Sequence, residues 1–246
     1  MEKAMKYTSH FLTVLFLMFS AISNAASNCS AAKYNEIRQA ATSTNDVVHI
    51  NCNVTLNSSD RITKHVIFLG SGSSNTTFNC SGALIDPIHK SSKDSILVTP
   101  QDQGRPRNIT VKHCHVNGAI RVRGASYNTQ DRNSAGYNFT SIIQQESPTD
   151  ITFSNLVIRN QWKGNSFYVS TGATNVTLKD SYISHQAPAL AVYLDAESSN
   201  TTIDNNEFHF SGTTDREMFA IDGSDLNQIT RNWFSGLSKG GIYLYR

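Results

Sequence analysis

The sequence predicts an all-β solenoid, a parallel β-helix, and three observations support this prediction. Five segments from about residue 108 onward can be superimposed, and each begins with a small polar residue and reaches an apolar pivot. The last four pivots, Phe153, Leu178, Ile203 and Ile229, lie 25, 25 and 26 residues apart, a period typical of solenoids. The units between them are short alternating strands joined by Asn, Gly, Ser and Asp turns, without a helical pattern.

Each unit carries two further apolar features after its pivot. A second anchor follows five residues later, and these anchors are Val116, Ile158, Ile183, Phe208 and Phe234. An alternating strand comes next, whose inward pairs are Ile120/Val122, Phe167/Val169, Val192/Leu194, Phe219/Ile221 and Ile242/Leu244. Because successive side chains of a strand point to opposite faces, the residues between these pairs are expected to face solvent.

Residues 1–25 are typical of a secretory signal peptide, and residues 26–246 are expected to form a single β-helix domain. A charged start is followed by the apolar stretch Phe11–Phe19 and a small-residue cleavage site ending at Ala25. The apolar run is too short for a lasting membrane span, and no later stretch could cross a membrane. The protein is therefore expected to be secreted, periplasmic or at the cell surface.

The two ends of the predicted solenoid differ. Residues 26–45 are expected to hold an N-terminal capping helix, in which Ser30 is the N-cap and Tyr34, Ile37 and Ala41 share one face. The last unit stops within a strand, so no C-terminal cap is expected. Either a partner covers this end, or the chain is a shortened version of a longer protein, which we favour.

Two polar segments, 86–107 and 126–148, interrupt the period and are expected to be loop excursions. The first contains a short strand-like piece, Ser95–Thr99. The second is rich in Asn, Gln and Ser, and it explains why Val111 and Phe153 lie 42 residues apart.

All four cysteines, Cys29, Cys52, Cys80 and Cys114, follow the predicted cleavage site, which favours disulfides over a metal site. Three pairings are possible, and we favour Cys29–Cys52 with Cys80–Cys114 because each would join neighbouring coils.

Several Asn-x-Ser/Thr triplets are potential glycosylation acceptors, but a role as turn residues before strands is favoured. They begin at Asn53, Asn75, Asn108, Asn138, Asn175 and Asn200.

The charge balance and the motifs exclude several classes of function. The chain has 21 Lys and Arg against 19 Asp and Glu, without the basic excess that a nucleic-acid-binding surface needs. It contains no P-loop, nucleophile elbow, H-E-x-x-H or G-x-G-x-x-G motif, so phosphoryl transfer, triad hydrolysis and dinucleotide chemistry have no support.

Stacking the coils in register arranges the outward residues of the alternating strands in two columns. The first column contains Arg121, Tyr168, Tyr193, Ala220 and Tyr243, and the second contains Arg123, Ser170, Asp195, Asp222 and Tyr245. Neighbouring coils are about 4.8 Å apart, so Asp195 and Asp222 would lie directly over one another. Tyrosine rings and guanidinium groups on the same face suit sugar rings and carboxylates.

The predicted carboxylate pair allows three arrangements. One acid holds a proton at a raised pKa, a cation such as Ca²⁺ bridges both, or both point into water. The first would make Asp195 and Asp222 a general acid and base. The second would make them metal ligands, and the third has no catalytic meaning.

Two further columns are expected on other parts of the solenoid. His115, Tyr182, Glu207 and Trp233 form an outward column in which Trp233 is expected to cover an edge. Asn155, Asp180 and Asn205 occupy one turn position in successive coils and are expected to form a structural ladder of side-chain hydrogen bonds.

The turn-and-strand units 150–160, 175–185 and 200–210, with stretches such as Ala191–Ser198 and Ala220–Ser224, resemble the right-handed parallel β-helix proteins of the pectate-lyase-like superfamily. The chain is most similar to uncharacterised exported bacterial members. The resemblance covers most of the chain and implies the right-handed fold and, since many relatives are lyases, hydrolases or epimerases, an acidic polysaccharide as substrate. No lyase signature can be carried over residue by residue.

Three functional hypotheses follow. The first is an exported enzyme acting on polysaccharide, in which Asp195 and Asp222 act as acid and base or Ca²⁺ ligands and Arg121 or Arg123 binds carboxylates. Its reaction would be β-elimination on uronic acids or two-carboxylate hydrolysis on other sugars. The second is a non-catalytic glycan-binding or cell-surface protein that uses the same tyrosine and arginine face. The third is a shortened remnant without activity.

Overall fold

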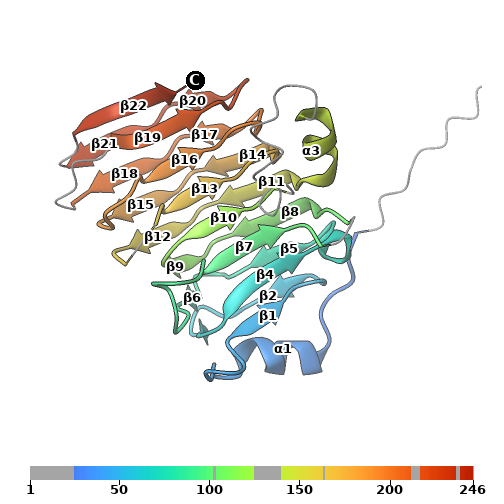
Figure 1. Cartoon of the computed structure of the whole chain (residues 1–246). Coiled ribbons are helices and arrows are strands. Elements are labelled where there is room, and N and C mark those ends of the chain that lie inside the picture. The colour runs from blue at the N-terminus through green and yellow to red at the C-terminus, as the bar shows by residue number, and fades with distance from the viewer. Residues whose placement is uncertain are drawn as a thin grey trace, which may run out of the picture.

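The structure, a computed structural model, describes most of the chain after the predicted signal peptide. The described residues are 25–101, 104–124, 140–162, 164–211, 217–236 and 239–245. Residues 1–24, which hold nearly all of the predicted signal peptide, lie outside this set, as does Asn138. The described residues form a solenoid of three sheets, and every strand pairing within the sheets is parallel (Figure 1).

Each complete coil contributes one strand to each sheet. The first sheet contains β1 Val47–His49, β4 His65–Leu69, β7 Ile96–Thr99, β10 Ile120–Val122, β13 Phe167–Val169, β16 Val192–Leu194, β19 Glu217–Asp222 and β22 Gly240–Tyr245. The second sheet contains β2 Val54–Thr55, β5 Thr77–Asn79, β8 Arg107–Lys112, β11 Thr149–Ser154, β14 Thr174–Lys179, β17 Thr202–Asp204 and β20 Gln228–Thr230. The third sheet contains β3 Arg61–Ile62, β6 Leu84–Ile85, β9 His115–Asn117, β12 Val157–Asn160, β15 Tyr182–His185, β18 Glu207–Phe210 and β21 Trp233–Gly236.

The register confirms the predicted repeat. The pivots are direct partners along the second sheet, from Val111 through Phe153 to Ile229. The anchors are direct partners along the third sheet, from Val116 to Phe234. A period of 25 or 26 residues therefore returns the chain to the same place on the next coil.

The interior is a continuous apolar core in which aromatic side chains from different sheets meet. Phe153 and Phe167 are fully buried and their rings meet edge to face at 5.4 Å. Phe208 and Phe219 make a similar contact at 4.8 Å. The predicted inward pairs are buried or half-buried from β10 to β19, but Ile242 and Leu244 of β22 are 43% and 75% exposed, because β22 is the edge strand of its sheet and no further strand in the described chain pairs with it.

The predicted N-terminal helix is confirmed, although it is shorter than residues 26–45. Helix α1 spans Ala31–Arg38, and the Ser30 hydroxyl accepts a hydrogen bond from the Lys33 amide, as an N-cap should. Ile37 is fully buried against the core. The buried Lys64 ammonium donates to the Glu36 carbonyl at 3.0 Å, which ties the last turn of α1 to the first coils. Figure 1 shows α1 beside β1, at the end of the solenoid opposite β22.

Each of the two predicted excursions contains one regular element. The strand-like piece in 86–107 is β7, which pairs in register with β4 and β10 and so belongs to the first sheet. Within 126–148, which was expected to be a loop excursion, the structure describes a helix, α3, at Thr140–Glu146. The part of this segment before α3 lies outside the described residues.

Positive-φ residues form two ladders at the turns on either side of the second sheet. In the first ladder φ lies between 52° and 60° at Asn75, Asn108, Asn175 and Asn200, a conformation that Asn tolerates better than most residues. Their side-chain amides bond from coil to coil, as between Asn108 and Asn75 at 3.0 Å. This supports the predicted turn role of the Asn-x-Ser/Thr triplets. The second ladder contains Asn155, Asp180 and Asn205, and its predicted side-chain bonding is confirmed between the last two, where the Asn205 amide donates to Asp180 at 2.7 Å.

Both favoured disulfides are present, Cys29–Cys52 and Cys80–Cys114. Each links a turn to the equivalent region of the next coil, as the pairing of β5 with β8 requires for the second. No helix in the described part of the chain has the length and apolar character needed to cross a membrane.

A buried histidine predicts a pH dependence of stability. Burial lowers the pKa of His185 below its ordinary value; its Nε2 donates to the Ala189 carbonyl, so Nδ1 accepts from Ser166 and the ring is neutral. Below about pH 6.5 the unfolded chain binds more protons than the folded chain. The free energy of unfolding is therefore fully retained above about pH 6.5 and decreases as the pH falls further. Urea unfolding at pH 7.5 and 5.0 should show this loss.

The matched variant His185→Gln keeps a side-chain donor but does not titrate. It should reduce the pH dependence without removing it, because burial also lowers the pKa of His65. An unchanged slope in this variant would contradict the assignment.

Candidate functional site

The outer face of the first sheet carries the two predicted columns. Register places Arg121, Tyr168, Tyr193, Ala220 and Tyr243 side by side on successive strands. Asp222 and Tyr245 are direct partners in the second column. Asp195 follows the last residue of β16, and its amide donates to the carbonyl of Val169 on the preceding coil, which continues the register. Asp195 and Asp222 therefore lie on one face of one sheet, on adjacent coils about 4.8 Å apart in backbone spacing.

Hydrogen bonds link the two columns diagonally. The Tyr168 hydroxyl donates to Asp195 on the next coil at 2.6 Å, and the Tyr193 hydroxyl donates to Asp222 at 2.7 Å. The Tyr168 and Tyr193 rings lie 5.0 Å apart. Each carboxylate thus accepts a hydrogen bond from the phenol of the preceding coil. This arrangement was not among the three considered from the sequence for the carboxylate pair.

Both phenols are held in the protonated form. Burial and the hydrogen bond to Asp195 raise the pKa of Tyr168 well above its ordinary value. Burial and the hydrogen bond to Asp222 do the same to the pKa of Tyr193. These tyrosines can therefore donate hydrogen bonds across the whole physiological range, but neither is suited to act as a general base.

The two carboxylates differ in the number of hydrogen bonds that they accept within the protein. One oxygen of Asp195 accepts from Tyr168 and from Thr171 at 3.3 Å, and its other oxygen accepts from the Ala196 amide at 2.9 Å. For Asp222, the structure records a bond from Tyr193 to one oxygen, with no side-chain donor for the other oxygen among the described residues. Asp222 has more capacity to bind a ligand.

The predicted arginines lie lower on the same face. The Arg121 guanidinium lies over the Tyr168 ring at 4.2 Å from its centre, and its Nε donates to Ser170 at 3.0 Å. Burial raises the pKa of Asp94, and the positive charges of Arg121 and Arg123 only partly offset this effect. Arg121 extends the Tyr168–Asp195 network through its contacts with Tyr168 and Ser170.

Helix α3 closes the corner at which the first sheet turns into the second. Gly172 permits its close approach, since a Cβ there would lie 2.3 Å from Ile143 of α3. Gly124 permits the close approach of the next coil, since a Cβ there would lie 1.4 Å from the Thr171 carbonyl oxygen. The Gln144 amide donates to the Glu197 carbonyl at 2.9 Å. The side wall beside Asp195 is therefore built by backbone contacts and α3.

A hollow of about 380 Å³ lies on the upper part of this face. Tyr193, Asp222 and Tyr245 line it, together with Asn165 and Glu217. Of the other predicted residues, Arg121, Tyr168 and Asp195 form the adjoining network, whereas Arg123 and Tyr243 line no part of the hollow.

Glu217 was missed from the sequence, because the alternating pattern that defined the strand began only at Phe219. It adds a second carboxylate to the lining of the hollow, at the opposite end of β19 from Asp222.

In the described chain, no group of three or more His, Cys, Asp and Glu side chains is arranged to hold a metal ion. A Ca²⁺ ion between Asp195 and Asp222 would therefore need most of its oxygen ligands from water or from a bound ligand.

The fold and this face define a parallel β-helix with an exposed polar and aromatic sheet. A family model described as the right handed beta helix region matches residues 40–208 and, in a second match, residues 149–246. The chain belongs to this right-handed β-helix family. No curated protein matches the sequence.

Three solved structures are similar to the chain. The surface protein and adhesin PfbA of Streptococcus pneumoniae shares 12% identity over 79% of this chain and 67% of its own, with a TM-score of 0.39. A second structure of PfbA shares 13% identity over 78% of this chain and 62% of its own, with a TM-score of 0.37. A candidate glycosyl hydrolase of Parabacteroides merdae ATCC 43184 shares 14% identity over 79% of this chain and 81% of its own, with a TM-score of 0.29. With TM-scores this low, these likenesses carry no argument about function.

Proposed function

We propose that the protein binds a polysaccharide along the outer face of the first sheet, with the hollow around Tyr193 and Asp222 as its main subsite. The observation that carries the proposal is the composition of this hollow: two tyrosine rings and two carboxylates on a rigid sheet. Aromatic rings pack against the apolar faces of sugars, while carboxylates accept hydrogen bonds from their hydroxyl groups. Arg121 and Arg123 lie on the same face, some coils away from the hollow. Their positive charges favour a polysaccharide chain that carries carboxylates.

Export to an oxidising compartment is part of the proposal. The predicted signal peptide and the two disulfides support it, since disulfides persist mainly outside the cytosol. A polysaccharide outside the cytoplasm, at a cell surface or in the surroundings, would then be within reach.

The test is binding to a panel of acidic and neutral polysaccharides, measured by affinity electrophoresis and calorimetry. Tyr193→Ala removes the ring and leaves Asp222 without its phenol donor, so affinity should fall about tenfold, equal to about 1.4 kcal/mol. His49→Ala is the matched control, since His49 is exposed on β1 of the same sheet, five strands away. Equal affinities for both variants would refute the proposed subsite.

Cleavage of the bound chain is a second candidate function, and the placement of Asp195 and Asp222 on adjacent coils, about 4.8 Å apart in backbone spacing, favours it. Two carboxylates can serve as acid and base in hydrolysis. On a uronic-acid chain the alternative is β-elimination, which yields unsaturated products. Asp222→Asn should abolish product formation while most binding remains; wild-type protein that binds a polysaccharide but releases no product would leave binding as the function.

A further inference from the structure

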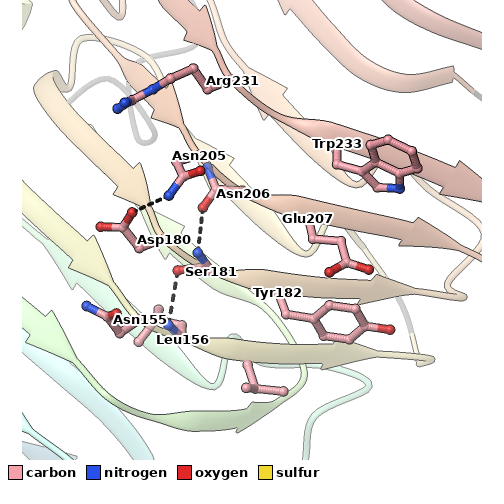
Figure 2. A pocket seen from close by; sticks show the side chains of 11 residues that line it. Asn155, Leu156, Asp180, Ser181, Tyr182, Asn205, Asn206, Glu207, Arg231 and Trp233 are labelled. Atoms are coloured by element: carbon pink, nitrogen blue, oxygen red, sulfur yellow. Dashed lines mark hydrogen bonds between the residues drawn. The ribbon is translucent and has the colours of Figure 1, made fainter.

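A groove of about 580 Å³ runs along the bend between the second and third sheets, away from the face described above. Figure 2 shows its two sides. On one side stand the outward side chains at the start of β15, β18 and β21, and on the other stand the turn residues that precede these strands.

Tyr182, Glu207 and Trp233 form the first side and are direct partners on adjacent strands. The two rings are therefore two coils apart, about 9.6 Å, with the carboxylate between them. Trp233 is 68% exposed on β21, the edge strand of its sheet in the described chain, so its ring packs little against the fold. An indole that is exposed to this extent on a regular sheet stabilises the fold little and is available to a ligand.

The floor of the groove is fixed by hydrogen bonds between coils. Asn205 donates to Asp180 at 2.7 Å, the Ser181 amide donates to the Asn206 side chain at 3.0 Å, and the Leu156 amide donates to the Ser181 hydroxyl at 3.0 Å. A ligand would therefore meet a preformed surface, which lowers the entropic cost of binding.

The charge of the groove is negative. Arg231 is its cationic lining residue, and its guanidinium is bound through two hydrogen bonds to Asp204. These bonds and that of Thr230 lower the pKa of Asp204 to about 2, so this pair is ionised and compensated. Asp180 and Glu207 have no ion-pair partner in the described part of the chain. An acidic chain would be repelled here.

We propose that this groove binds an uncharged saccharide chain, in which sugar rings stack on Trp233 and Tyr182 and hydroxyl groups between them donate to Glu207. The proposal combines two rings at a fixed spacing, a central acceptor, a rigid amide-rich floor and a negative charge that excludes uronic acids. It does not depend on the function proposed for the first sheet.

The chain has two tryptophans, which allows a direct test. In a Trp162→Phe background, Trp233 is the sole indole, and its fluorescence reports on the groove. Hexamers of β-1,4-linked glucose and of N-acetylglucosamine are the neutral probes, and oligogalacturonate is the acidic one. We expect a saturable spectral change with at least one neutral hexamer and none with oligogalacturonate.

Calorimetry on variants of the wild-type chain completes the test. Trp233→Ala should weaken binding of the neutral hexamer about tenfold or more, and Glu207→Gln about fivefold. His115→Ala is the matched control, being exposed in the same column four strands from Trp233. Trp233→Ala should not change the binding of an acidic polysaccharide at the first sheet. The proposal for the groove and the proposal for the first sheet can therefore be refuted independently.

No saturable response to either neutral hexamer at up to about 10 mM would overturn the proposal, since binding weaker than this is about 3 kcal/mol or less. The proposal would also be overturned if Trp233→Ala and His115→Ala changed the affinity for the neutral hexamer equally. Circular dichroism of each variant shows whether the fold is retained, as the exposure of all three side chains predicts.

Discussion

Replacing Phe153 with alanine is expected to destabilise the protein by about 3–5 kcal/mol, the range for removing a fully buried aromatic side chain. Phe153 is 0% exposed and contacts Phe167 of the first sheet at 5.4 Å between ring centres. Its strand pairs with β8 below and β14 above. The cavity would therefore open between three coils, and little can collapse into it because the strand spacing is set by the backbone.

Urea unfolding measures the loss, and hydrogen exchange on β8, β11 and β14 locates it. Phe234→Ala is the control for the same substitution, because Phe234 is an anchor of the third sheet that packs on Phe208 but is 38% exposed, and it should cost clearly less. If Phe153→Ala costs under about 1 kcal/mol, the interior would not be the close-packed core described above.

Removing the disulfide between Cys80 and Cys114 has the second-largest expected effect. The bridge joins residues 34 apart, and the loss of its constraint on the unfolded chain corresponds to about 4 kcal/mol at 25 °C in the chain-entropy model. Both cysteines are fully buried in the core. The double variant Cys80→Ala/Cys114→Ala should therefore unfold at a much lower urea concentration.

The Cys29–Cys52 bridge provides the comparison. It joins residues 23 apart and lies at the end of the solenoid that carries α1, and Cys29 is only partly buried. Its removal should cost slightly less in the same model, about 3.5 kcal/mol. A reducing agent should lower the stability of the wild type and leave that of a variant without cysteines unchanged; equal sensitivity of both would contradict the assignment.

The sequence was sufficient for the register because one signal was repeated many times. Apolar pivots at a constant spacing leave a single way to align the coils, and a slip by one residue would turn Phe153 and Leu178 outward. The same register predicted the disulfide pairing, since the bridges of neighbouring coils were the ones within reach. It also placed Asp195 and Asp222 on one face.

What the register could not supply was the direction of long side chains. Alternation shows that Tyr193 faces outward, but only its rotamer sends the hydroxyl to Asp222 on the next coil. Glu217 lines the hollow but precedes the alternating apolar and polar pattern by which the strand was predicted. Helix α3 escaped notice because it is seven residues long and follows a polar segment, which leaves little periodicity to recognise.

The stacking of coils also has a mechanical consequence. Strands in the described chain pair only with the equivalent strands of the coils immediately before and after. Tension applied along the solenoid axis would therefore unravel the protein by successive steps, each of which releases one coil of about 25 residues. Coils crossed by a disulfide would not extend under the same pull, so force spectroscopy should record shorter steps at the blue end of the chain in Figure 1 than at the red one.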